Sequence, residues 1–198
     1  MKYNIIIKKA GKECYRIKFC GLVRDLPLFE VAPGVKICIF NILGDTQLVK
    51  KIGLALSKKL PQADILVTAE VKSIPLIYEV ARRLKLPYIV LRKIVKPYMV
   101  GAIKSRVVTI TTGKPQDLWL DGKDKKVLAG KKVILLDDVI STGATIKGMH
   151  KLVKKAGGEV VCEAAVFIEG DPKKWKKVIS LGNLPVFVKG QTLRRGKV

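Results

Sequence analysis

The sequence predicts an α/β fold with a mainly parallel, twisted sheet flanked by helices. Strand-like and helix-like segments alternate over residues 35–168, which is the pattern of such folds. Short, wholly apolar runs such as "DILVTAE" (64–70) are typical of parallel strands that are buried on both faces. The segments between these runs repeat apolar residues at helical spacing. The chain has 198 residues, enough for one compact domain with its own core.

The amino-terminal part is predicted to begin with a β-hairpin. Its two strands are residues 3–9 and 14–20, joined at "AGKE". A further strand is predicted over 35–43. Asp45 then caps a helix that runs to about Leu60, whose apolar face is formed by Leu48, Ile52, Leu56 and Leu60.

The next segments repeat the strand–helix alternation. After the strand at 64–70, Ser73 is predicted to cap a helix with Pro75 in its first turn, ending at "LKLP". A strand over 88–93 follows. Further along, "KKVILLDD" is a strand, 143–156 a helix and 159–170 another strand.

Residues 97–115 are predicted to form a mobile lid. Prolines and glycines bracket the segment, and its β-rich middle, "RVVTITT", has few obvious core partners. Lids are drawn from the less stable parts of a structure. The structured alternative is that 106–112 is a fixed strand of the sheet.

The composition points to a protein that attracts anions. There are 39 Lys and Arg against 16 Asp and Glu, for a net charge of +23, and such a field raises the association rate of anions. A lysine-rich solvated surface explains the excess equally well. No apolar run is long enough to cross a membrane, so a cytoplasmic protein is expected. The four cysteines lack metal-ligand spacing and are interpreted as buried free thiols.

Three segments are expected on one edge of the sheet: 69–73, 92–98 and 137–145. Ligands of open α/β sheets bind beyond the carboxyl ends of the strands. In "VILLDDVISTGAT" (133–145), the turn at Gly143 opens a helix, and free N–H groups at a helix start bind phosphate. Asp137 and Asp138 would repel a phosphate in direct contact. They suit vicinal hydroxyls one sugar away, or a magnesium ion.

The same stretch resembles the motif of type I phosphoribosyltransferases that binds 5-phosphoribosyl 1-diphosphate (PRPP). The resemblance extends over about residues 20–170, in the style of the adenine and xanthine enzymes of purine salvage. It implies a single domain, 1–198, with a hairpin and hood at 1–34, an α/β core at 35–170 and a C-terminal segment at 171–198. By resemblance, Asp137 and Asp138 hold the ribose hydroxyls. The loop that holds the 5′-phosphate comprises Ser141, Thr142, Gly143, Ala144 and Thr145.

The other site residues also follow from the resemblance. "AEVKSIP" stands where the family has its pyrophosphate loop, with Ser73 in place of a glycine. The pyrophosphate set is Glu70, Val71, Lys72, Ser73, Arg92, Lys93 and Lys96. Tyr98, Lys104 and Arg106 fall in the flexible loop, where Thr111 and Thr112 replace the acid and the aromatic residue of the adenine enzymes. "GLVRDLPLF" (21–29) resembles the hood of those enzymes, so the base is expected against Leu22, Val23, Arg24 and Val139.

The resemblance implies an enzyme that transfers the phosphoribosyl group of PRPP to a purine, with adenine preferred. It implies Mg²⁺ bound through PRPP, with no direct protein ligand assigned, and a homodimer. Xanthine or hypoxanthine remains an alternative base. A second alternative is a PRPP-sensing regulator that binds nucleic acid. Such regulators carry an additional amino-terminal DNA-binding domain, whereas only residues 1–20 precede the hood stretch here.

Overall fold

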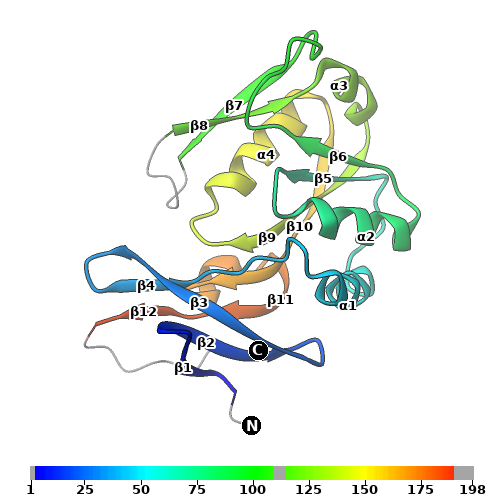
Figure 1. The fold of residues 1–198 in the computed structure, drawn as a ribbon. Helices are drawn as coiled ribbons and strands as arrows, with labels where there is room; N and C mark the ends of the chain where they lie inside the picture. The colour runs from blue at the N-terminus through cyan, green and yellow to red at the C-terminus, as the bar shows by residue number, and fades with distance from the viewer. Residues whose placement is uncertain (1–2, 109–114, 190–198) are drawn as a thin grey trace.

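A computed structural model describes residues 3–108 and 115–189 of the chain, and Figure 1 shows their arrangement. The chain forms two five-stranded sheets and a two-stranded hairpin that packs against the helix at Ala144–Lys155 (Figure 1). The parallel sheet has the strand order β11-β10-β9-β5-β6. Its strands are β5 (Ile65–Ala69), β6 (Tyr88–Leu91), β9 (Lys132–Ile140), β10 (Glu159–Glu169) and β11 (Ile179–Leu184). The α/β prediction is confirmed.

The central strands β5 and β9 are buried on both faces because helices or strands cover each side. Alternating side chains sort into two cores. Leu66 and Leu136 face one core, which contains α1 (Thr46–Ser57) and α2 (Ile74–Leu84). Val67 and Leu135 face the other, which contains α4 (Ala144–Lys155). The short elements α3 (Gly122–Leu128) and η1 (Pro172–Trp175) complete the helical set of the described residues.

The second sheet is antiparallel and is called the hood sheet here, because it covers one edge of the parallel sheet (Figure 1). Its order is β1-β2-β3-β4-β12. Its strands are β1 (Ile5–Lys9), β2 (Lys12–Phe19), β3 (Leu22–Ala32), β4 (Val35–Cys38) and β12 (Val186–Val188). The predicted hairpin at 3–20 is confirmed. Strand β12, from the far end of the chain, pairs with β4 through Val186 and Ile37.

The strand predicted over 35–43 is wrong in length and in partners. It ends at Cys38 and belongs to the hood sheet, and 39–45 is an irregular passage to α1. Phe40 and Ile42 in this passage are almost fully buried. Their apolar character therefore reflects packing into the core and not a continued strand. The helix expected after Asp45 is confirmed, since the Asp45 carboxylate accepts the Leu48 N–H at 3.0 Å.

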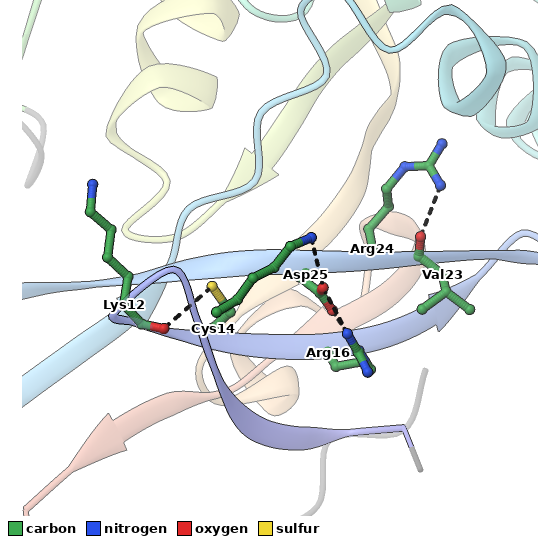
Figure 2. A network of polar contacts seen from close by, with 7 residues as sticks. Lys12, Cys14, Arg16, Val23, Arg24 and Asp25 are labelled. Carbon is green, nitrogen blue, oxygen red and sulfur yellow. Dashed lines mark hydrogen bonds and ion pairs between the residues drawn. The ribbon is translucent and has the colours of Figure 1, made fainter. Parts of the chain in front are cut away.

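Polar contacts fix the hood sheet internally and against α1. Arg16 on β2 forms a bidentate ion pair with Asp25 on β3, at 2.6 and 2.9 Å, and Lys9 joins at 3.2 Å (Figure 2). The Arg16 guanidinium, more than any other group, lowers the pKa of Asp25 to about 2. The neighbouring Arg24 points away from this network in Figure 2. It pairs instead with Asp45 at the start of α1, at 2.6 Å.

The segment predicted as a lid contains one side of a hairpin. Strand β7 (Ile103–Val108) pairs with β8 (Pro115–Leu120), a strand that the sequence pattern did not suggest. The expectation of few core partners is wrong, because Val107 is buried against α4. A Cβ at Gly148 would lie 2.3 Å from Val107 Cγ1, so only glycine allows this approach. Thr111 and Thr112 lie outside the described residues.

Among the described residues, no helix is long and apolar enough to cross a membrane.

Candidate active site

A cavity of about 340 Å³ lies between the hood sheet and the carboxyl ends of β5, β9 and β10. The core side of its wall contains residues 69–73 and 137–146, with Lys93 and Glu169. The hood side is largely apolar and includes Val31, Val35, Ile37, Cys38, Phe40 and Val186. The cavity therefore joins a polar wall to an apolar one, which is the usual make-up of a small-molecule site.

The acid pair, Asp137 and Asp138, lies near the carboxyl end of β9, and both side chains are almost fully buried. The Lys72 ammonium lies 2.7 Å from Asp138 Oδ2 and also donates to the Phe40 carbonyl at 3.3 Å. Burial, and then the neighbouring Asp138, raises the pKa of Asp137. Two carboxyl groups are thus held side by side, with one cation to balance them.

Ser73 supports the acid pair and does not cap its helix. Its side chain makes no capping hydrogen bond at the start of α2. The hydroxyl donates to Asp137 Oδ1 at 3.0 Å and lies 3.4 Å from Asp138 Oδ1. The predicted capping role is therefore wrong: the hydroxyl is oriented toward the carboxylates, and its oxygen accepts no N–H of the first turn of α2.

The predicted phosphate loop turns sharply at Gly143, whose φ is 76°. Helix α4 begins at Ala144, so its first turn, whose N–H groups lack helical partners, lies at the cavity edge. All of 141–145 line the cavity. Trp175 on η1 packs against the turn, and a Cβ at Gly143 would lie 2.2 Å from its Cη2 atom. Glycine is therefore required here both by conformation and by space.

Glu169 is a cavity residue that the sequence prediction missed. It ends β10, is 7% exposed and accepts the Ser141 hydroxyl at Oε2, 2.6 Å away. Burial raises its pKa, while Ser141 and the charge of Lys72 oppose that rise. A signal was available: "AAVFIEG" is another apolar run that ends in an acid, as β9 does.

The residues predicted to bind pyrophosphate separate into two groups. Glu70, Val71, Lys72, Ser73 and Lys93 line the cavity. Arg92 and Lys96 are not among the lining residues. Arg92 pairs with Glu70 at 2.7 Å, and the Lys93 N–H donates to the same carboxylate at 2.5 Å. Glu70 therefore ties the 92–93 segment to the loop after β5.

The residues predicted in the flexible loop do not reach the cavity. Lys104 and Arg106 on β7 both pair with Asp117 on β8, at 3.1 and 3.3 Å. Tyr98 is exposed and does not line the cavity. Both cationic side chains therefore form cross-strand ion pairs in this structure.

Of the residues predicted to contact the base, only Val139 lines the cavity. Leu22, Val23 and Arg24 do not, because they begin β3 whereas the cavity lies at its other end, at Val31. At about 3.3 Å per residue, the start of the strand is about 23–30 Å from Val31. Within β3, only Val31 lines the cavity.

Comparisons with known proteins identify the family. The family model described as phosphoribosyl transferase domain matches residues 41–183. The hypoxanthine/guanine phosphoribosyltransferase of Methanococcus voltae is 30% identical over 174 residues, which cover 86% of this chain and 85% of that protein. This chain belongs to the phosphoribosyl transferase family. The prediction of a phosphoribosyltransferase enzyme is confirmed at that level.

Two further proteins are similar to this chain, one in structure and one in sequence. The adenine phosphoribosyltransferase of Thermoanaerobacter pseudethanolicus shares the fold, with a TM-score of 0.62 at 21% identity, over 81% of this chain and 94% of that one. The purine biosynthesis transcriptional activator PurR of Lactococcus lactis is 26% identical over 76% of this chain and 55% of its own length. The matched family region excludes residues 1–40, which form most of the hood sheet.

The polar wall of the cavity fits a metal ion that is bound mainly through the oxygen atoms of a substrate. Within 3–108 and 115–189, no cluster of three or more His, Cys, Asp or Glu side chains could hold a metal. Asp138 already forms an ion pair with Lys72. A hard cation such as Mg²⁺ keeps several waters and is commonly bound through substrate phosphates. The residues present fit that mode, with Asp137 and Asp138 as acceptors for its waters.

Proposed function

We propose that this phosphoribosyltransferase transfers the phosphoribosyl group of PRPP to a purine, releasing pyrophosphate. One observation carries the proposal: a single cavity unites the acid pair, the Gly143 turn and an apolar hood. These are the surfaces that a ribose, a 5′-phosphate and a flat base each require. Hypoxanthine and guanine are the leading bases, because the relatives with 30% or more identity carry those names.

In the proposed complex, the 5′-phosphate binds the N–H groups of 143–145 and the hydroxyls of Thr142 and Thr145. The ribose hydroxyls donate to Asp137 and Asp138. In the structure Lys72 and Ser73 contact these carboxylates, so substrate hydroxyls would replace or join existing partners. The acid pair then fixes the sugar so that its reacting carbon faces the base, and positioning of this kind lowers the barrier substantially.

The pyrophosphate would lie against 70–73, where Lys72 and Lys93 supply positive charge. Mg²⁺, bound through PRPP oxygens, would neutralise charge on the departing pyrophosphate. The side chain of Lys72 lies between the acid pair and the hood passage at Phe40. It can therefore turn from Asp138 to a pyrophosphate oxygen without a change in backbone position.

The base would lie between Val139 and the hood residues Val31, Val35, Ile37 and Val186. These side chains exclude water from the reacting carbon, which protects PRPP from hydrolysis. Adenine is the second candidate, since solved adenine phosphoribosyltransferases share this fold.

A direct assay tests the proposal. The protein is incubated with PRPP, Mg²⁺ and each purine in turn, and nucleotide and pyrophosphate are measured together. Equal amounts of both products with at least one purine are expected. Release of pyrophosphate without nucleotide, or no reaction with any purine, would contradict it. A double variant, Asp137→Asn with Asp138→Asn, is the matched inactive control.

The likeness to PurR supports a second candidate, a PRPP-responsive protein that binds nucleic acid. Scattered surface lysines alone give weak, non-specific binding that falls steeply with salt. A sequence-specific complex that survives physiological salt and responds to PRPP would favour the regulator. A homodimer remains a prediction for either function, to be tested by light scattering.

A further inference from the structure

We propose that Trp175 is a positioning residue for the loop at 141–145: its indole ring packs against the Gly143 turn and holds the loop in the shape that binds a phosphate. The inference rests on the proposed function and deepens it, because it gives a residue outside the cavity a part in binding the 5′-phosphate. Trp175 is not among the residues that line the cavity. It therefore acts through the loop and not by touching the ligand.

The contact is made by the far end of the indole ring. A Cβ placed on Gly143 would lie 2.2 Å from Cη2, 3.0 Å from Cζ3 and 3.3 Å from Cζ2 of Trp175. These are three adjacent atoms at the tip of the six-membered ring, so the ring meets the turn end-on. Glycine has the widest backbone freedom of any residue. A rigid ring against it limits that freedom from outside the loop.

The backbone on both sides of Trp175 is fixed by hydrogen bonds within its own segment. Strand β10 runs parallel to β9 and pairs Ile168 with Ile140, so the segment after β10 follows the loop after β9. At the start of η1, the Asp171 carboxylate accepts the Lys173 N–H at 3.0 Å. After the ring, the Trp175 carbonyl accepts the Val178 N–H at 3.0 Å. The ring is therefore carried by an ordered turn.

Trp175 is turned inward, unlike its neighbours in the sequence. The lysines that flank it, at 173, 174, 176 and 177, are all exposed, whereas the tryptophan is partly buried. Its ring packs against the core that contains Ile146 and Met149 of α4. The indole thus rests on the same helix that begins directly after the Gly143 turn, and it supports the junction of loop and helix.

The indole N–H does not explain why a tryptophan stands here. Trp175 Nε1 is buried and has no hydrogen-bond partner within residues 3–108 and 115–189. A buried donor without a partner is unfavourable, and a phenyl ring would avoid it. The indole differs from a phenyl ring in its longer reach from the backbone. The atoms at the end of that reach are the ones that contact Gly143.

The same segment holds the loop at a second point. Glu169, at the end of β10, accepts the Ser141 hydroxyl at 2.6 Å. Ser141 and Gly143 are thus both held before any ligand arrives. A loop that is already ordered loses less conformational entropy when it binds, which raises affinity. Removal of the ring should free the Gly143 turn and weaken the binding of a phosphate there.

The experiment measures two ligands that use different parts of the proposed site. Ribose 5-phosphate would use 141–145, and pyrophosphate with Mg²⁺ would use 70–73. Their affinities are measured by calorimetry in the full-length wild type, Trp175→Leu and Trp175→Phe. Trp175→Leu should weaken ribose 5-phosphate binding about tenfold or more and change pyrophosphate binding less than about twofold. Trp175→Phe, which keeps a shorter ring, should lie between the wild type and Trp175→Leu.

A double variant tests the contact itself. Gly143→Ala brings a Cβ into the ring tip, whereas in a Trp175→Leu background that ring is absent. Gly143→Ala should therefore weaken ribose 5-phosphate binding at least about fivefold less in the Trp175→Leu background than in the wild type. If the ring and the turn act independently, the two losses of affinity will simply multiply, which would contradict the inference.

The other of the two tryptophans provides the matched control. Trp119 lies on β8 and does not line the cavity, so Trp119→Phe should leave both affinities unchanged. In that variant the tryptophan fluorescence comes from Trp175 alone. Its emission should change when ribose 5-phosphate binds and stay constant with pyrophosphate.

Three outcomes overturn the inference. Folded Trp175→Leu could bind ribose 5-phosphate as the wild type does, or both Trp175 variants could lose the two ligands equally, which would indicate a general structural role. Failure of the wild type to bind ribose 5-phosphate would remove the loop from the site. Turnover with a purine tests the proposed function separately, because none of these affinities requires turnover.

Discussion

The two walls of the cavity differ in how the chain builds them. Each contribution to the core wall comes from a strand and the loop directly after it, as with β5 and 70–73, or β9 and 141–145. The hood wall combines β3 and β4 with β12, and β12 follows β4 by most of the length of the chain. The core wall is polar and its side chains bind one another, whereas the hood wall is apolar.

This difference separates two kinds of substrate contact. Polar groups held in fixed positions suit phosphates and sugar hydroxyls, whereas an apolar roof suits a flat ring. Substitutions in the core wall should therefore act on PRPP, and substitutions in the hood wall on the base. The predictions below test that division, from the largest expected effect to the smallest.

The largest effect is expected at Gly143. Gly143→Ala places a Cβ 2.2 Å from the Trp175 ring in a residue whose φ is 76°, so the turn must move. PRPP affinity should fall at least ~100-fold, and overpacking should cost about 1–3 kcal/mol of unfolding free energy. Calorimetry with PRPP and thermal unfolding measure the two effects.

A second glycine provides the matched control for conformation alone. Gly130 has a φ of 71°, and a Cβ there meets nothing within 4 Å. Gly130→Ala should cost only about 1–2 kcal/mol of unfolding free energy for the left-handed backbone, with PRPP affinity unchanged. Equal losses of PRPP affinity in the two variants would show that the Gly143 turn has no special part in binding.

The acid pair should lose activity far more than stability. Asp137→Asn with Asp138→Asn keeps the shape of both side chains but replaces the carboxyl groups that are proposed to accept the ribose hydroxyls. We expect kcat/KM for PRPP to fall about 100-fold or more, with little change in the denaturant midpoint. Normal turnover in the folded double variant would rule out the ribose assignment.

The same pair predicts a dependence of stability on pH. The pKa of Asp137 is raised in the folded protein, chiefly by burial, so above about pH 4 the native state binds more protons than the unfolded chain. The free energy of unfolding should therefore fall as pH rises through this window. Asp137→Asn should reduce that slope. The pKa of Glu169 is also raised. In the Asp137→Asn variant it should therefore leave a smaller decrease of unfolding free energy with pH. Denaturant titrations across this range would show identical slopes if Asp137 titrates normally.

Substitutions in the hood wall should affect the base and not PRPP. Val186→Ala removes two methyl groups from the roof, and KM for the base should rise about threefold to tenfold, since a lost methylene-sized contact is worth roughly 1 kcal/mol. KM for PRPP should not change. Val188→Ala, on the same strand but 38% exposed and outside the cavity wall, is the control. A rise in KM for PRPP alone would reverse the proposed division.

The contrast between the walls also explains what the sequence could predict. The core wall was foreseen because each of its segments carries a local pattern: an apolar run, then acids or a glycine turn, then a helix. Asp137, Asp138 and 141–145 all line the cavity as a set. Glu169 was missed because a single acid at the end of an apolar run is a weaker signal than the acid pair, and only the register with β9 brings it beside Ser141.

The hood was foreseen only in part because its strands pair across long separations. The pairing of Val186 with Ile37 has no local signature. Without it, 35–43 looked like one buried strand of the parallel sheet. Likewise, β8 supplies Asp117 to Lys104 and Arg106, and without that partner the cations looked available for a ligand. Local patterns predicted elements, and non-local pairing decided their neighbours.

The smallest effect is expected at Arg24. We predicted a contact with the base there, and the structure shows an ion pair that links two elements. Arg24 joins β3 to Asp45 at the start of α1, at 2.6 Å, and both side chains are partly exposed. Such pairs are worth about 0.2–1 kcal/mol, and Asp45 still accepts the Leu48 N–H when the arginine is removed. Arg24→Ala should therefore lower the unfolding free energy by about 1 kcal/mol or less, leaving KM for the base unchanged. Arg24→Lys should restore part of the stability, because it keeps the charge but not the two-pronged geometry. Kinetics with the preferred base and denaturant titration give both values. A change in base preference in Arg24→Ala, with stability preserved, would return the start of β3 to the base site and show that the hood wall extends beyond the cavity.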